Sequence, residues 1–419
     1  MSVKEIKRAG SYIVGLILAL LLAPLLFFIA FLCRFCKKSR DVGLGPEPLI
    51  NNVYHKKALE LCGYSAETFV SEVYFITDQF DIRADKLFPA NLLLRTLGAR
   101  WSSRYIYLLR YVYLFVLALR RYRCLYIYFN GGPLGLLGAR FGIELLRKME
   151  PFLYKLARVR VVVLPYGNDV QEMSRSPNPL FKHAVAQDYP GHRSRRQTVA
   201  DQVDRWTKHA DHIISGCEWV DYMYHWDTLM LAHFSIDVDL WKPVGQPPAG
   251  SSAKLRILHA PNHRAIKGSQ YFINAVGELI AEGLDVELVL VEHLPNDEVR
   301  KIMASVDIVA DQLIIGWYAM FALEAMAMEK PVLCYLRGDL KQLYMVAGLI
   351  APDEIPIINC TPLTVKEVIR DLATNRGKLP EIGRRSREYV IKHHSTQAVG
   401  QVFDAINRSI GIRPSSAKV

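Results

Sequence analysis

The sequence predicts an α/β protein with two doubly wound domains, and three observations carry this prediction. At 419 residues the chain exceeds the usual size of one domain. Continuous apolar runs that suit buried strands alternate with segments of helical periodicity, an order typical of parallel sheets covered by helices. A stretch rich in Pro, Gly and Ser at residues 242–254 separates two such series. The apolar content of 51% excludes a disordered chain.

The first domain is expected over residues 41–243. In chain order its elements are a helix at 55–62, strands at 66–74 and 124–129, a helix at 136–149, a strand at 159–164, a helix at 201–210 and a strand at 212–215. Breaks at Gly131-Gly132-Pro133 and in the loop 165–169 follow two of these strands. Both loops therefore lie at the carboxyl ends of strands, where doubly wound sheets bind ligands.

A linker at 244–254 leads to the second domain, expected over residues 255–395, and a closing helix and tail follow at 396–419. The expected elements are strands at 255–259, 286–291, 308–310 and 331–335, helices at 269–282, 296–303 and 321–328, and closing helices over 379–407. Two such domains joined by a linker place a ligand cleft between their strand ends.

Residues 1–40 are expected to form an N-terminal membrane anchor. Tyr12 to Cys33 is an uncharged apolar run of roughly 22 residues, about 33 Å as a helix, which is enough to cross a bilayer as a transmembrane helix. A signal peptide is the alternative, but the run is too long and no A-x-A-type site follows it. Basic residues are slightly more numerous after the run, which favours a single-pass protein with its domains on the cytoplasmic side. Seven scattered cysteines also favour a reducing compartment.

A second apolar and aromatic stretch, residues 105–123, is interrupted by Arg110 and ends in a basic cluster. It suits either a helix packed within the domain or a surface helix in the membrane interface. Aromatic residues interleaved with arginines also occur in RNA-binding proteins, but no RNP-like motif accompanies them, so no nucleic-acid partner is expected. The net charge of +11 indicates an anionic partner, such as a membrane surface or a phosphate-bearing substrate.

Two cations follow the first strand of the second domain. Arg264 and Lys267, with Gly268 after them, lie in a strand-to-helix loop at the expected cleft. An arginine fork and a lysine point charge suit a diphosphate. A merely solvated basic loop is the alternative interpretation.

A second motif lies at residues 307–333. A strand leads through a turn at Gly316, Trp317 and Tyr318 into a helix that contains Glu324. Free backbone N–H groups and the positive end of this helix would face a phosphate. Glu324 is placed to accept hydrogen bonds from ribose hydroxyls, or else is an ordinary salt-bridged helix residue.

The region from His259 to Tyr335 resembles the donor domain of the GT-B-fold glycosyltransferases, particularly the retaining family 4. The matching residues are Arg264, Lys267, Gly268, Glu324-Ala325-Met326-Ala327 and Pro331-Val332. The end of the first domain, residues 236–243, is similar to the family's G-V-D-x-x-x-F-x-P, and residues 393–395 fit its closing helices. The resemblance implies two Rossmann-like domains, the first for an acceptor and the second for a nucleotide sugar.

The resemblance also implies a hexosyltransferase-like enzyme that needs no cofactor beyond its nucleotide-sugar co-substrate. It would transfer the sugar, with retention of configuration, to a glycan or lipid-linked glycan at the membrane. The basic pair would contact the diphosphate, and the expected donor-binding residues are Arg264, Lys267, Gly268, Gly316, Trp317, Tyr318 and Glu324. Asn168 and Asp169 are the expected catalytic residues, and Asn130 is a further polar residue on the cleft side. Ordinary turn residues are the alternative for all three.

Three positions depart from the family pattern. Gly316 replaces the first acid of its E-x7-E element, Ala319 replaces a glycine of the turn, and Glu329 replaces the glycine before a lysine. These departures keep open a catalytically inactive membrane scaffold, and a GT-B-fold sugar-nucleotide epimerase is a third possibility.

Asp237-Val238-Asp239 resembles the metal motif of another glycosyltransferase fold, but it lies at a domain end, so no metal is expected. Cations and a helix N-terminus would stabilise the leaving diphosphate instead.

Overall fold

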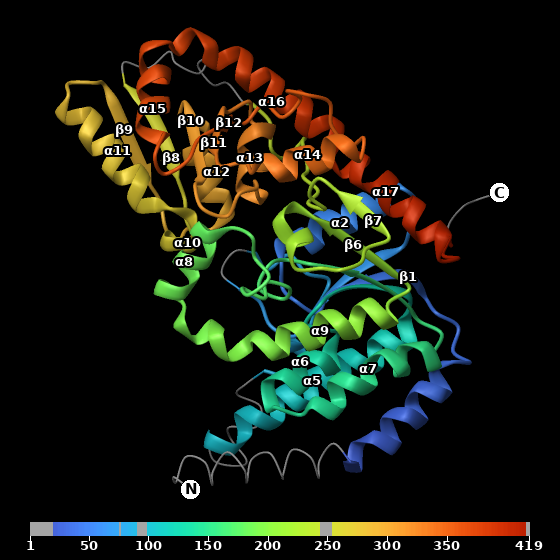
Figure 1. Cartoon of the computed structure of the whole chain (residues 1–419). Coiled ribbons are helices and arrows are strands. Elements are labelled where there is room, and N and C mark those ends of the chain that lie inside the picture. Colours follow the sequence, from blue (N-terminus) through green and yellow to red (C-terminus); the bar gives the residue numbers. More distant parts are fainter. Residues whose placement is uncertain (1–19, 75–76, 90–98, 244–253, 416–419) are drawn as a thin grey trace, which may run out of the picture.

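The computed structural model describes residues 20–415 except 75–76, 90–98 and 244–253. Two α/β domains lie one above the other, the first below and the second above in Figure 1. The predicted linker at 244–254 falls outside the described residues except for its last residue. All pairings between the described strands are parallel, so the carboxyl ends of neighbouring strands meet at one edge of each sheet.

The first sheet has seven strands in the order β3-β2-β1-β4-β5-β6-β7. Their bounds are β1 Arg40–Leu44, β2 Ala66–Val70, β3 Ile82–Arg83, β4 Tyr122–Tyr128, β5 Arg160–Leu164, β6 His212–Gly216 and β7 Thr228–Met230. The chain order reverses between the neighbours β1 and β4. Such a switch point leaves a crevice at the carboxyl ends of the two strands, where open α/β sheets bind ligands.

Helices cover both faces of this sheet, because successive residues of a strand point to opposite sides. In β4, Cys124 and Tyr126 share a cluster with residues of α2 and α17, whereas Leu125 and Ile127 pack in the cluster that includes α5, α6 and α7. The helices of this domain are α2 Ile50–Leu61, α3 Ala84–Leu87, α5 Ala99–Arg121, α6 Pro133–Phe141, α7 Glu144–Leu156, α8 Pro179–Asp188 and α9 Arg196–His209.

The second sheet has five strands in the order β12-β11-β10-β8-β9, with a second switch point between β8 and β10. The strands are β8 Leu255–His259, β9 Val286–Leu290, β10 Ile308–Gln312, β11 Val332–Cys334 and β12 Ile358–Asn359. The helices are α10 Arg264–Lys267, α11 Ser269–Ala281, α12 Asn296–Ala304, α13 Met320–Ala327, α14 Gly338–Val346, α15 Val365–Thr374, α16 Leu379–His394 and α17 Thr396–Ser409.

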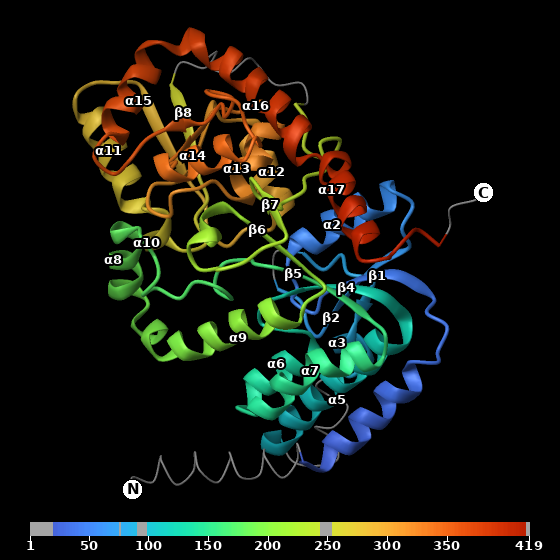
Figure 2. The same cartoon turned by 45° about the vertical axis from the view of Figure 1, so that its right-hand side comes forward.

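Helix α17 returns from the second domain to the first and packs along α2 (Figures 1 and 2). Gly400 permits this close approach, because a Cβ there would lie 2.5 Å from the backbone oxygen of Ala58. Buried Phe403 of α17 completes the apolar cluster over the first sheet. The last helix of the chain therefore ties the two domains together.

Most predicted elements are present, with three informative differences. Strand β1 was not predicted; it is a five-residue strand of mixed polarity in which Asp41 is buried and accepts hydrogen bonds from Ser65 and Ser415. The helix expected at 136–149 is two helices, α6 and α7, separated at Gly142. Helices α14 and α15 were also not predicted, although Val365, Ile369 and Leu372 of α15 follow the spacing of one buried helix face.

The stretch at 105–123 forms most of α5 and the start of β4. Ile106, Leu114 and Phe115 are buried, and buried Arg110 donates two hydrogen bonds to the backbone oxygen of Phe88. The interpretation of this stretch as a helix packed within the domain is therefore confirmed.

The expected membrane span at 12–33 is only partly described. Residues 12–19 lie outside the described residues, and residues 20–33 form a helix whose Leu26, Ala30 and Cys33 pack into the core of the first domain. Among the helices in the described ranges, none combines the length and apolar character needed to cross a bilayer. The prediction of a spanning helix therefore has no structural support.

Glu329 provides a test of backbone strain in the fold. It is exposed, with φ of 57°, in the left-handed region that glycine adopts freely. We expect Glu329→Gly to raise the free energy of unfolding by about 1 kcal/mol, measured by urea denaturation. Glu329→Ala keeps a Cβ at the same φ and serves as the control. An equal gain in both variants would contradict the strain account.

Candidate functional site

The two predicted cations lie at the switch point of the second sheet. Lys267 Nζ donates to Oδ1 of Asp311 at 2.7 Å, and this carboxylate at the end of β10 is fully buried. Arg264 donates two hydrogen bonds to Glu292, and the arginine side chain is 54% exposed. Gly268 ends α10 in the left-handed region, against Ile314. Each of the two cations is therefore paired with a carboxylate, Lys267 with a fully buried one and Arg264 with a partly exposed one.

The turn between β10 and α13 is organised by the buried side chain of Gln312. Its Oε1 accepts hydrogen bonds from the backbone N–H groups of Ile314 and Ile315, and its Nε2 donates to the backbone oxygen of Trp317 at 2.6 Å. The turn is thus held by a residue within β10. Gln312 was not singled out from the sequence, because a lone glutamine in an apolar run carries no specific signal.

Trp317 and Tyr318 were expected at the donor site, but the structure places both side chains in the core between the domains. Trp317 Nε1 donates to the backbone oxygen of Leu231 at 2.8 Å. The Tyr318 hydroxyl lies 2.8 Å from that of Tyr389 and 2.9 Å from Nε2 of His394. Each side chain is 1% exposed. Any contact of these two residues with a donor is therefore limited to the backbone.

Gly316 lies where the resembling family has its first acid, and the adjacent space is filled by Arg337. A Cβ on Gly316 would lie 2.6 Å from Cδ of Arg337, and its φ of 100° disfavours other residues. The Arg337 guanidinium pairs with Asp221 of the first domain and with Asp339. A buried cation, itself paired across the domains, thus replaces the expected carboxylate.

Ala319 does not strain the turn, although the resembling family has a glycine at this position. Its φ of −127° and ψ of −169° are extended values open to any residue. Its backbone N–H donates to Oδ2 of Asp311 at 3.2 Å, at the start of α13. Asp311 therefore connects Lys267 to the N-terminus of α13.

Glu324 lies inside α13 and is only 4% exposed. Its Oε1 accepts a hydrogen bond from Nδ2 of Asn296 at 2.9 Å. Burial, reinforced by nearby Asp311, raises the pKa of Glu324 to about 8. A ribose would have to reach a carboxyl that is largely shielded from solvent and already bonded to Asn296 through one of its two oxygens.

Three polar side chains meet at the switch point of the first sheet. Asn130, after β4, donates from Nδ2 to Oε1 of Glu47 at 2.8 Å and to the hydroxyl of Tyr166 at 2.7 Å. Burial raises the pKa of Glu47, which follows β1. Asn130 was predicted to lie on the cleft side, whereas Glu47 was not, because β1 was not predicted. An acid directly after that strand is the signal that would have found it.

The two expected catalytic residues have different surroundings. Asp169 is fully buried and accepts hydrogen bonds from the backbone N–H groups of Phe129, Tyr166 and Gly167. It therefore ties the loop after β4 to the loop after β5, and burial raises its pKa to about 7. Asn168 is exposed at the sheet edge, and its Oδ1 accepts a 2.6 Å hydrogen bond from Arg195. Only Asn168 is positioned to meet a ligand.

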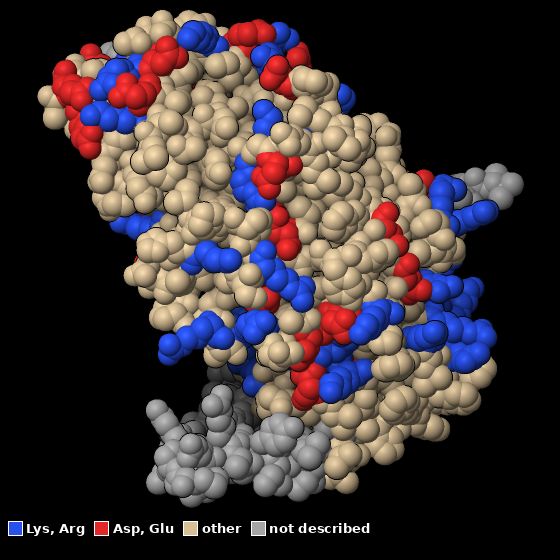
Figure 3. Space-filling model, viewed as in Figure 1, with Lys and Arg blue, Asp and Glu red and all other residues tan. Residues whose placement is uncertain are grey.

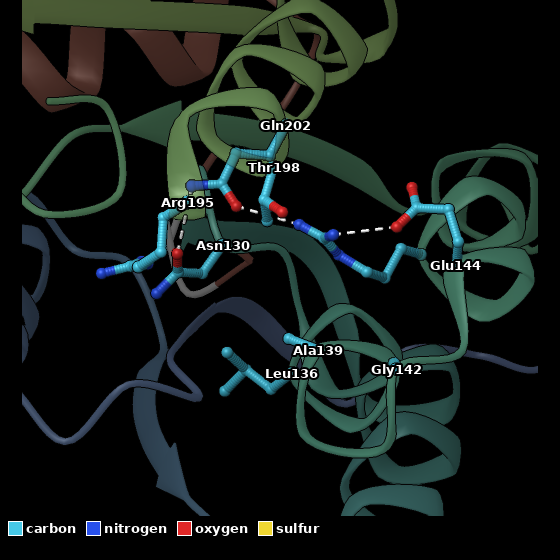
Figure 4. Close-up of a pocket in the computed structure, with 10 residues that line it drawn as sticks. Asn130, Leu136, Ala139, Gly142, Glu144, Arg195, Thr198 and Gln202 are labelled. Carbon is cyan, nitrogen blue, oxygen red and sulfur yellow. Dashed lines mark hydrogen bonds and ion pairs between the residues drawn. The ribbon is translucent and has the colours of Figure 1, made fainter. Parts of the chain in front are cut away.

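A pocket of about 370 Å³ opens beside this edge, between α6, α7 and α9 (Figure 4). Its lining residues are Asn130, Leu136, Gly138, Ala139, Gly142, Glu144, Arg147, Arg195, Thr198 and Gln202. Arg147 lies between Glu144 and Gln202, with 2.9 Å hydrogen bonds to both. Since Gln202 in turn donates to Asn130, the pocket is joined to the switch point by side-chain hydrogen bonds.

The two domains contact one another through polar groups as well as apolar ones. Asn178 donates to the backbone oxygens of Ile314 and Ile315 at 2.8 and 3.0 Å, and Tyr344 donates to the backbone oxygen of Cys217 at 2.9 Å. The turn at the second switch point is thus held from the first domain.

The contacts of Asp237 stabilise the local backbone. It pairs with Lys57 and accepts hydrogen bonds from the backbone N–H groups of Asp239 and Leu240. Within the described part of the chain, no group of three His, Cys, Asp or Glu side chains is arranged to hold a metal ion.

No protein-family model matches this sequence, and no curated protein matches it either. Solved structures do match. Sucrose-phosphate synthase from Thermosynechococcus elongatus is 14% identical, with a TM-score of 0.57 over 89% of this chain and 99% of that one. HepE of Anabaena, in complex with UDP and glucose, is 13% identical, with a TM-score of 0.56 over 88% of this chain and 100% of that one.

The matches cover both domains of this chain and nearly all of each solved chain. They confirm the predicted GT-B arrangement of two parallel α/β domains. At these identities the likeness is one of fold, so the roles of individual residues rest on the geometry described above.

The contrast between Asp169 and Asn168 is testable. We expect Asp169→Asn to lower the free energy of unfolding by about 1–3 kcal/mol, because an amide nitrogen would face a backbone N–H donor. Asn168→Ala, the matched control on the same loop, should leave stability within about 0.5 kcal/mol of the wild type. Thermal unfolding followed by circular dichroism measures both. Equal stability of the two variants would contradict the role of Asp169 in holding the loops after β4 and β5 together.

The raised pKa of Glu324 predicts a pH dependence of stability. A carboxyl whose pKa is higher in the folded state stabilises the protein below its unfolded pKa, and this contribution is lost as pH rises toward 8. Glu324→Gln retains an acceptor for Asn296 and removes the titration. Its unfolding free energy should therefore fall less than that of the wild type between pH 5 and pH 8, measured by chemical denaturation. Parallel curves would show that Glu324 does not titrate in this range.

Proposed function

We propose that the protein is a glycosyltransferase that transfers a sugar from a nucleotide-sugar donor to a glycan or lipid-linked glycan at a membrane. The observation that carries the proposal is the cation pair Arg264 and Lys267 at the switch point of the second sheet, opposite a polar edge of the first sheet. The HepE structure, similar in fold over nearly the whole chain, holds UDP and glucose. The resemblance to family 4 supports retention of configuration.

The donor diphosphate would bind between α10 and the start of α13. Lys267 would exchange Asp311 for a phosphate oxygen, and Arg264 would exchange Glu292, so that both cations stabilise the charge that develops on the leaving diphosphate. The N-terminus of α13 adds its partial positive charge. These groups are sufficient for a metal-independent reaction, and Glu324 would accept a hydrogen bond from the ribose.

The acceptor would enter from the first domain. The pocket beside Asn130, with Arg195 and Arg147 at its wall, offers hydrogen-bond donors suited to hydroxyl or anionic groups of a glycan. Glu47 follows β1 and Asn168 follows β5 at the same edge of the sheet, so these two residues would contact the acceptor. We place the two domains on the cytoplasmic side, which agrees with seven unpaired cysteines.

A catalytically inactive scaffold is the second candidate, and one observation favours it. Arg337 fills the space beside Gly316 and pairs with Asp221, so the side of the cleft that would face the sugar has a paired cation in place of a carboxylate. A scaffold of this kind would keep the fold and lose nucleotide binding.

Turnover of nucleotide sugars distinguishes the two candidates. Purified protein should hydrolyse or transfer from at least one member of a panel of UDP-, GDP- and ADP-sugars, and Lys267→Ala should lower the rate by about 100-fold or more. Lys301→Ala is the matched control, since Lys301 also pairs with a carboxylate but lies on α12 with its side chain 69% exposed. Unchanged turnover in Lys267→Ala would refute the assigned site.

A further inference from the structure

The helix at residues 20–33 has two apolar faces, and only one of them is covered by protein. Leu26, Ala30 and Cys33 are at most 3% exposed and pack into the core of the first domain. The opposite side, here called the outer face, consists of Leu21, Leu25, Phe28, Phe31 and Leu32, together with Phe35 in the turn that follows the helix, each between 48% and 73% exposed. A helix that is apolar all round is normally buried on every side, so the outer face needs a partner.

The outer face is continuous and uncharged. Its residues recur every three or four positions, which places them on one side of the helix, and the described helix contains no charged residue. In Figure 3 the lower right end of the molecule, where this helix lies, is almost entirely tan. A contiguous apolar patch of this kind marks an interaction site.

Basic residues border the outer face at one end. The turn after the helix carries Arg34, Lys37 and Lys38, and Lys38 donates to the backbone oxygens of both Cys33 and Leu119. This contact brings the C-terminus of α5, with exposed Arg120, beside the end of the helix. In Figure 3, Lys and Arg side chains gather along the right edge just above the tan region.

The acids nearest to this basic border are already neutralised. Glu67 pairs with Arg40 and Arg121, and Asp41 pairs with Arg123. Among the described residues, Arg34, Lys37 and Arg120 have no ion-pair partner. The border is therefore net positive, which complements an anionic surface and not a second copy of the same border.

We propose that the outer face lies in the plane of an anionic phospholipid bilayer, with its apolar side chains inserted at the headgroup level and Arg34, Lys37 and Arg120 against lipid phosphates. Apolar insertion combined with attraction to anionic lipids is the physical basis of interfacial helices. The protein core covers the other face, so the described helix does not need to span the bilayer. The proposal extends the proposed function, because it holds the first domain against the surface that would present a lipid-linked acceptor.

Co-sedimentation of the full-length protein with vesicles tests the proposal. Binding should be strong to phosphatidylcholine vesicles that contain phosphatidylglycerol, weaker to phosphatidylcholine alone, and reduced by high salt. The affinity of the triple variant Leu25→Ser/Phe28→Ser/Leu32→Ser for these vesicles should be lower than that of the wild type by a factor of about ten or more. Val346→Ser/Leu363→Ser is the matched control, since these apolar residues are 88% and 93% exposed on the second domain.

A charge variant separates the two contributions. Arg34→Gln/Lys37→Gln/Arg120→Gln should lose the preference for anionic vesicles and keep the weaker binding to neutral ones. Equal melting temperatures of the variants and the wild type would show that each variant folds. If the triple variant loses vesicle binding but its melting temperature still shifts with nucleotide, membrane binding and nucleotide binding are tested separately. Wild-type binding that the triple variant retains would overturn the proposal. The proposal would also be overturned if the wild-type protein did not bind vesicles. It would be overturned as well if the wild-type protein were a dimer and the triple variant a monomer, since the outer face would then be a dimer interface.

Discussion

The candidate site depends on one constraint, the reversal of strand order in each of two parallel sheets. In the first sheet β1 and β4 are neighbours although far apart in the chain, and in the second sheet β8 and β10 are neighbours. Each reversal opens a crevice at the carboxyl ends of the strands. Glu47 and Asn130 meet at the first crevice, and Lys267 and Asp311 at the second. The chemistry expected of the protein thus follows from which strands are adjacent.

The contact between the domains includes a buried ion pair. Arg337 of the second domain is paired with Asp221 of the first, and both side chains are less than 10% exposed. Removing one partner of such a pair costs about 3–5 kcal/mol, because a buried charge is left without compensation. The pair occupies the space that an acid at position 316 would need. A glycine at position 316 and the arginine at position 337 are therefore linked, because the Arg337 side chain lies where a Cβ of residue 316 would be.

The sequence predicted the alternation of strands and helices in two parallel α/β units, because this alternation rests on local patterns. Arg264 and Lys267 follow β8 as expected, and their contact with a donor stays a prediction. It did not predict β1, whose five residues include a buried aspartate and a glycine, and Glu47 was missed with it. Nor did it distinguish Asp169 from Asn168, since adjacent polar residues in one loop differ only in which backbone groups surround them. Trp317 and Tyr318 were assigned to the donor by position in a motif, whereas packing between the domains decides where their side chains lie.

The most direct measurement is a structure of the protein with a nucleoside diphosphate or nucleotide sugar bound. The account predicts a diphosphate between α10 and the start of α13, within hydrogen-bond distance of Lys267 Nζ, with the Lys267–Asp311 ion pair of the ligand-free protein replaced. It also predicts that the Arg337–Asp221 pair remains beside Gly316. A nucleotide bound elsewhere, or saturating nucleotide that leaves the second switch point empty, would contradict the central claim.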